Sequence, residues 1–192
     1  MQRLLHKDEQ QFAELLRTLT GTFQLYDERK PELHDSLLAL LDLAGATFKE
    51  HGRSERESFC ASLRAEFTTA LRGINPTTLE KSAVRRHEMQ SSTAFRIMQA
   101  LESQLRADLL EVTDTLHRAE DLIGQILLAS IQKGLISDAD IRDTVTQDAI
   151  ETLWRSIASD ADIALGEKRV LLIVSRFDVY LLIDTLLSGL RA

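Results

Sequence analysis

Cysteine, proline and glycine are scarce in this sequence, and so are aromatic residues. The 192 residues include one cysteine, two prolines, eight glycines and 5% aromatic residues. A single cysteine, Cys60, excludes an intramolecular disulfide framework, and the shortage of proline and glycine removes the residues that hairpins and tight turns need. The 33 leucines and 19 alanines are instead good helix formers. The composition therefore predicts an all-α protein.

Long apolar runs are also missing. The start of the chain contains no apolar run that resembles a signal peptide. The most apolar stretch, residues 170–190, contains Arg176, Asp178 and Asp184, and three charges make crossing a bilayer costly. We expect a cytoplasmic protein with no membrane partner, in which residues 170–190 belong to a protein core.

The formal net charge is −7, and all of the acidic excess lies in the second half of the chain. Residues 1–96 hold 14 basic and 14 acidic side chains, whereas residues 97–192 hold 9 and 16. An acidic surface repels phosphate backbones, so we expect no nucleic-acid partner. The one basic cluster, Lys81 with Arg85, Arg86 and His87, is typical of an exposed helical charge run.

Apolar residues recur at helical spacing through the first half of the chain. They predict helices over residues 2–29, 31–52 and 54–73. The second of these has its apolar face at Leu33, Leu37, Leu40, Ala44 and Phe48. Ser54 and Glu57 have the spacing of a capping box at the start of the third. Asn75 and Pro76 predict the start of a short fourth helix.

Residues 92–133 contain no proline and carry two interleaved seven-residue series. One is Phe95, Glu102, Leu109, Leu116, Ile123 and Ser130, and the other is Met98, Leu105, Val112, Ala119, Ile126 and Lys133. The second follows the first by three residues, as the a and d positions of a coiled coil do. The pattern predicts one coiled-coil-like helix of about 63 Å.

Capping signals continue in the second half. Ser137 and Asp140 predict a helix that runs to about residue 159, and Gly166 separates it from a last helix over residues 170–190. Residues 170–174 would also suit a β-strand, but no second convincing strand is present to pair with them. We therefore expect an elongated all-α bundle of about six or seven helices. It forms a single domain over residues 1–192, with one candidate soft boundary near residues 86–92.

No catalytic or nucleotide-binding fingerprint occurs, because the strings GxSxG, GxGxxG and GxxxxGK[ST] are all absent. Cys60 is expected to be a buried structural thiol. Asp114, His117 and Asp121 share one helix face, with Glu120 close by, so they are the candidate metal ligands. The apolar seam passes beside them, so we expect this face to be solvated.

Residues 137–157 suggest two further kinds of site, and simple chemistry argues against both. Asp138, Asp140 and Asp143 lack the central glycine and final glutamate of a calcium-binding EF-hand loop. A helix-turn-helix with its turn at residues 144–147 would place mainly acidic side chains beside DNA phosphates.

These features favour a non-enzymatic helical interaction or regulatory protein that acts through protein–protein contacts and needs no cofactor. Charges on the last helix define no single solvent face, so most of this helix must contact protein. We therefore expect a two-fold homodimer in which a second copy of the chain covers part of the last helix. The expected interface includes Leu109, Leu116, Ile123, Phe177 and Leu181.

Two alternative functions stay open. One is a helical metal-binding protein or enzyme that uses Asp114, His117, Glu120 and Asp121. The other is a small-molecule sensor domain with a pocket near Trp154 and Tyr180.

Overall fold

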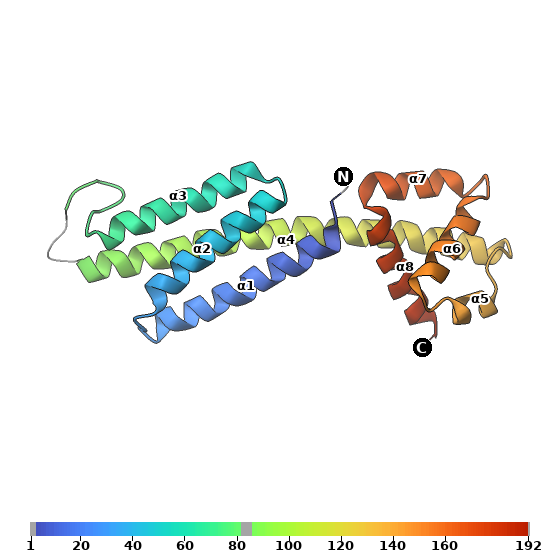
Figure 1. The fold of residues 1–192 in the computed structure, drawn as a ribbon, viewed down its shortest axis with the longest axis horizontal. Coiled ribbons are helices and arrows are strands. Elements are labelled where there is room, and N and C mark those ends of the chain that lie inside the picture. The colour runs from blue at the N-terminus through green and yellow to red at the C-terminus, as the bar shows by residue number, and fades with distance from the viewer. Residues whose placement is uncertain (1–2, 82–85, 192) are drawn as a thin grey trace. The chain divides into compact units, whose positions relative to one another are not determined.

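The computed structural model describes residues 3–81 and 86–191, and these residues form eight α-helices with no extended strand (Figure 1). The helices are α1 (Leu5–Asp27), α2 (Leu33–Glu50), α3 (Ser54–Leu71), α4 (Arg86–Gln132), α5 (Asp138–Asp143), α6 (Gln147–Ala158), α7 (Ala164–Ile173) and α8 (Arg176–Arg191). The predicted all-α bundle with one long helix is confirmed. The additional helices arise because two predicted helices are each interrupted.

The chain divides into two compact units, and α1 and α4 contribute residues to both. The first unit is residues 10–110, and the second unit is residues 3–9 together with residues 111–191. The predicted soft boundary near residues 86–92 falls at the start of α4, within the first unit. Whether the whole chain unfolds as one domain stays a prediction.

The first unit packs α2 and α3 beside parts of α1 and α4 (Figure 1). The predicted face of α2 is buried at all five positions, Leu33, Leu37, Leu40, Ala44 and Phe48. Phe12 of α1 meets Phe48 with 5.7 Å between ring centroids. The core of this unit is therefore an apolar stripe from each helix, as the 3.6-residue period requires.

The sequence analysis was wrong at two helix starts in the first unit. Ser54 and Glu57 do not form a capping box, because Arg53 is the N-cap residue and Ser54 is already inside α3. Residues 75–81, the described part of the predicted fourth helix, form no helix. The side-chain oxygen of Asn75 accepts hydrogen bonds from the backbone N–H groups of Thr77 and Thr78, which closes a turn, and the chain then forms a single β-bridge between Ile74 and Lys81. An Asx turn thus replaces the helix cap that the same residue types predict.

The long helix α4 begins at Arg86 rather than at residue 92, and its 47 residues span about 70 Å at 1.5 Å per residue. The Met98 series is buried from Met98 to Ile126, but the Phe95 series changes along the helix. Phe95 is 38% exposed, whereas Leu116 and Ile123 are 4% and 0% exposed. A regular α-helix drifts by about 20° per seven residues relative to a seven-residue repeat. The Phe95 series therefore begins at the edge of the buried face and moves into it.

The second unit gathers α5 to α8 around the C-terminal part of α4 (Figure 1). The predicted capping box at Ser137 and Asp140 is confirmed. The helix it starts does not run to residue 159, because α5 ends at Asp143 and Thr146 caps a separate helix, α6, by accepting a hydrogen bond from the backbone N–H of Ala149. Ile150, Trp154 and Ile157 form the buried face of α6.

The last predicted helix is also interrupted, because residues 170–173 end α7 and residue 176 begins α8. Ser175 accepts a hydrogen bond from the backbone N–H of Asp178, and the Asp178 carboxylate accepts one from the backbone N–H of Ser175. This reciprocal pair is a capping box. Residues 170–173 are helical, so the alternative strand over residues 170–174 does not form.

Candidate functional site

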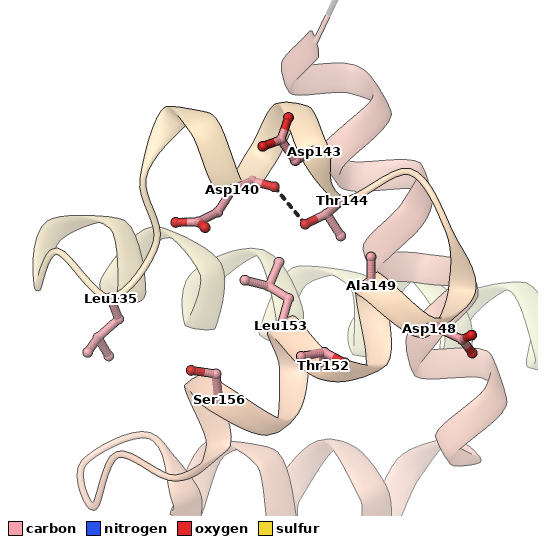
Figure 2. A pocket seen from close by; sticks show the side chains of 9 residues that line it. All are labelled: Leu135, Asp140, Asp143, Thr144, Asp148, Ala149, Thr152, Leu153 and Ser156. Carbon is pink, nitrogen blue, oxygen red and sulfur yellow. Dashed lines mark hydrogen bonds between the residues drawn. The ribbon is translucent and has the colours of Figure 1, made fainter.

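A surface hollow of about 480 Å³ lies between α5 and α6, and we call it the α5–α6 hollow. Figure 2 shows Leu153 pointing from α6 toward α5, with Asp140 and Asp143 on α5 and Asp148 at the start of α6. Leu153 is half-buried, and Leu135, in the turn after α4, adds an exposed leucine. The hollow therefore combines an apolar floor with three carboxylates. An oxygen of Asp140 is already used in the Ser137 capping box, which lowers the pKa of this carboxyl.

A second hollow, of about 370 Å³, lies beside Trp154 and Tyr180, and we call it the tryptophan hollow. Helices α6, α7 and α8 and the C-cap residue of α6 supply its lining: Glu151, Trp154, Arg155, Ala158, Ser159, Glu167, Arg176 and Tyr180. A depression is thus present where the sequence suggested a ligand pocket, and its occupancy by a small molecule stays a prediction.

Charged groups surround the Tyr180 phenol in this hollow. Partial burial raises the pKa of Tyr180, the carboxylates of Glu151 and Glu167 raise it further, and the guanidinium groups of Arg176 and Arg155 oppose them. Arg155 Nη2 donates to Glu151 Oε1 at 2.7 Å, so these two charges are paired within one turn of α6. The tryptophan hollow therefore offers aromatic surface together with charges of both signs.

The candidate metal ligands lie on α4 within the second unit. Asp114, His117 and Asp121 are exposed, and Glu120 is half-buried. Across residues 3–81 and 86–191, no group of three or more His, Cys, Asp or Glu side chains is placed to hold a metal ion. The geometry gives no support to the alternative of a metal-binding protein or metalloenzyme.

The basic cluster is described only in part, since Arg85 lies outside the described residues. Arg86 donates to the backbone oxygen of Leu71, and its side chain lies against Gly73. His87 lines a depression of about 260 Å³ together with Tyr26, His34 and Gln90. Arg86 is exposed, and its guanidinium group contacts the C-terminal end of α3.

Sequence reasoning did not identify Asp178 as a buried carboxylate with several hydrogen-bond partners in the second unit. It is 0% exposed and accepts hydrogen bonds from the backbone N–H groups of Leu5 and His6, both at 3.1 Å. The His6 Nδ1 atom lies 2.9 Å from the same carboxylate, and Ser175 Oγ lies at 2.7 Å. Burial opposes the charged form, but the hydrogen bonds from His6, Ser175 and Leu5 hold the pKa of Asp178 below its ordinary value. One carboxylate therefore caps both α8 and the start of α1.

A comparable structural cluster surrounds Asp108 in the first unit. Arg53 and Arg56 form ion pairs with this buried carboxylate, and Gln104 donates to it at 2.8 Å. The Arg53 guanidinium also lies 5.5 Å from the centroid of the Phe12 ring. These contacts satisfy a buried charge, which is the usual requirement for stability.

Cys60 lies in the same unit and is buried, as predicted. Burial raises the pKa of its thiol to about 11, with a further contribution from the Asp108 carboxylate. Because the thiolate is the reactive form, we expect Cys60 to react with a disulfide reagent at pH 8 about a hundredfold more slowly in the folded protein than in the unfolded chain. Equal rates in buffer and in denaturant would contradict this burial.

The five predicted interface residues differ in the surface they leave for a partner. Leu116 and Ile123 are covered by their own chain, whereas Leu109 and Leu181 are half-buried and Phe177 is exposed. More apolar surface is found on α7, where Leu165 and Leu172 are 60% and 85% exposed. Sequence analysis placed Leu172 in one continuous buried helix over residues 170–190, and it placed Leu165 in no helix, because it took Gly166 as the separator before that helix.

Comparison with protein-family models, with curated proteins and with solved structures finds no match for this chain. No helix in the described part of the chain combines the length and apolar character needed to cross a membrane.

Proposed function

We propose that this chain is a non-enzymatic, cytoplasmic interaction protein that acts through protein–protein contacts and associates with itself. The observation that carries the proposal is the outer face of α7. Leu165 and Leu172 are seven residues apart and therefore lie on one side of this helix, and both are largely exposed. Exposed leucines at this spacing are typical of a helix that docks against another protein.

The α7 face is also positively charged. Lys168 and Arg169 are exposed and lie between the two leucines on the same side of the helix. The opposite side of α7 packs inward, where Gly166 lies against Ile126 of α4 and Val170 is fully buried. The outer face therefore consists of two leucines flanked by two cations.

The α5–α6 hollow has complementary chemistry. Its leucines, Leu135 and Leu153, are flanked by the carboxylates of Asp140, Asp143 and Asp148. Since both surfaces belong to the second unit, two copies related by a two-fold axis would each place α7 in the hollow of the other. We therefore propose a second copy of this chain as the partner of the α7 face. Opposite charges across such a contact favour correct pairing and fast association.

The first test replaces one exposed leucine. Leu172→Gln is expected to weaken the homodimer at least about tenfold, which corresponds to about 1.4 kcal/mol, without lowering the melting temperature. Leu128→Gln is the matched control, because Leu128 is 57% exposed on α4 and lies outside both surfaces. Sedimentation velocity over a concentration series measures both. If both variants weaken the homodimer equally, or if neither weakens it, the assignment of α7 to the dimer interface is contradicted.

A charge-exchange experiment tests the partner surface. Lys168→Glu alone and Asp143→Lys alone should each impair dimerisation, because each variant opposes like charges at both contacts of its dimer. An equimolar mixture of the two variants should dimerise, because both contacts of the mixed dimer then join opposite charges. If the mixture stays as monomeric as the separate variants, α7 does not dock in the α5–α6 hollow.

A further inference from the structure

A residue that lines the tryptophan hollow carries a buried hydrogen-bond donor that has no acceptor. Trp154 is 3% exposed, and its indole Nε1 is buried without a hydrogen-bond partner. Buried polar groups in folded proteins are nearly always paired, and an exception calls for an explanation such as a ligand. The unpaired indole N–H belongs to a residue that lines a hollow, so a bound molecule with an acceptor oxygen is a direct explanation.

Two opposite charges in the same hollow also lack partners. Arg155 and Glu151 neutralise each other through their 2.7 Å contact. Arg176 and Glu167, by contrast, form no ion pair with any other residue in the described ranges, although both line the hollow and both act on the Tyr180 phenol. The hollow therefore presents one cation and one carboxylate to a ligand, together with the aromatic surface of Trp154 and Tyr180.

We propose that the tryptophan hollow binds a free α-amino acid with an apolar side chain. The ligand carboxylate would pair with Arg176, and the ligand ammonium group would pair with Glu167. The apolar side chain would lie against the two aromatic residues, and a carboxylate oxygen would accept from the indole N–H. The volume of about 370 Å³ lies in the range of small-molecule sites.

The proposal does not depend on self-association, because every lining residue comes from one chain. It gives the protein a second activity, in which a small zwitterion binds beside α7 and α8 and stabilises the folded second unit by mass action. The ligand class follows from charge: a molecule with only a carboxylate leaves Glu167 unpaired, and a molecule with only an ammonium group leaves Arg176 unpaired.

Fluorescence offers a direct measurement, because Trp154 is the single tryptophan of the chain. The full chain is titrated with L-valine, L-leucine, L-methionine and L-phenylalanine, and at least one is expected to give a saturable change in emission. The amide of the tightest ligand, which lacks the carboxylate, and its deaminated acid, which lacks the ammonium group, should each bind at least about tenfold more weakly. The proposal would be overturned if none of the four amino acids gave a saturable response. It would also be overturned if the amide or the deaminated acid bound as tightly as the tightest amino acid.

Variants connect the binding to the two unpaired charges. Arg176→Gln and Glu167→Gln should each weaken binding of the tightest amino acid at least about tenfold. Arg118→Gln on α4 and Asp184→Asn on α8 are matched controls at exposed positions outside the hollow, and they should bind as the unmodified protein does. If the controls weaken binding as much as the hollow variants do, the ligand does not occupy this site. Thermal melts of all four variants show that each is folded.

Discussion

Replacing Asp178 by alanine is expected to lower the free energy of unfolding by about 3 to 5 kcal/mol, because it breaks a buried hydrogen-bonded charge network. The variant removes the acceptor for the backbone N–H groups of Leu5, His6 and Ser175. It also removes the partner of the His6 imidazole. The loss therefore affects the start of α1 and the start of α8 together, and chemical denaturation measures it.

The control for this substitution lies on the same helix. Asp184 is exposed, so Asp184→Ala is expected to change the free energy of unfolding by less than about 0.5 kcal/mol. If Asp178→Ala also changes it by less than this amount, the carboxylate does not cap the two helices as described.

The same carboxylate gives the protein a dependence on acidic pH. The pKa of Asp178 is lower in the folded protein than its ordinary value of 3.8, so its contribution to stability is fully present above that value. The contribution is lost as the pH falls below about 4 and through the folded-state pKa. On acidification from neutral pH, the melting temperature of Asp178→Asn should therefore fall less than that of the unmodified protein. Thermal melts over a pH series measure this difference.

Ile123→Ala is the second substitution with a large expected effect, a loss of about 2 to 5 kcal/mol in the free energy of unfolding. Ile123 is fully buried on α4, so its truncation removes apolar contacts and leaves a cavity. Leu128→Ala on the same helix is the matched control, because Leu128 is largely exposed. We expect the control to stay within about 0.5 kcal/mol of the unmodified protein. Equal losses at the two positions would contradict the orientation of α4 in the second unit.

The fold class could be predicted from the sequence because the spacing of apolar residues and the residues that start and end helices are local signals. The stripe from Leu33 to Phe48 is buried at every predicted position, and Gly134 adopts the positive φ angle of 71° expected after a helix. The break before α8 also had a local signal, since Ser175 and Asp178 have the same capping-box spacing as Ser137 and Asp140. It was overlooked because the largely apolar stretch through residues 170–187 suggested one buried helix.

The features that sequence could not predict depend on contacts between distant residues. The partner of Asp178 is His6, 172 residues earlier in the chain, and Arg53 lies 55 residues from Asp108. No local spacing encodes either pair. The tryptophan hollow was predicted only as a region near Trp154 and Tyr180, whereas its charged lining also includes Glu167 from a third helix, α7, and Arg176 from the start of α8.

The heptad interpretation of α4 shows a further limit of pattern analysis. A strict seven-residue repeat and a 3.6-residue helix agree over a few turns and then separate. Over 47 residues the difference is large enough to leave Phe95 at the edge of the buried face while Ile123 lies at its centre. The interface assigned to Leu116 and Ile123 was drawn from that repeat, and these side chains are covered within the chain.

Self-association is the central claim, and light scattering coupled to size-exclusion chromatography tests it most directly. The unmodified protein at tens of micromolar should elute with twice the monomer mass of 21.6 kDa. On dilution the mass should fall toward the monomer value, as a reversible dimer requires. A mass of 21.6 kDa at every concentration up to that range would contradict the proposal that α7 docks on a second copy of this chain.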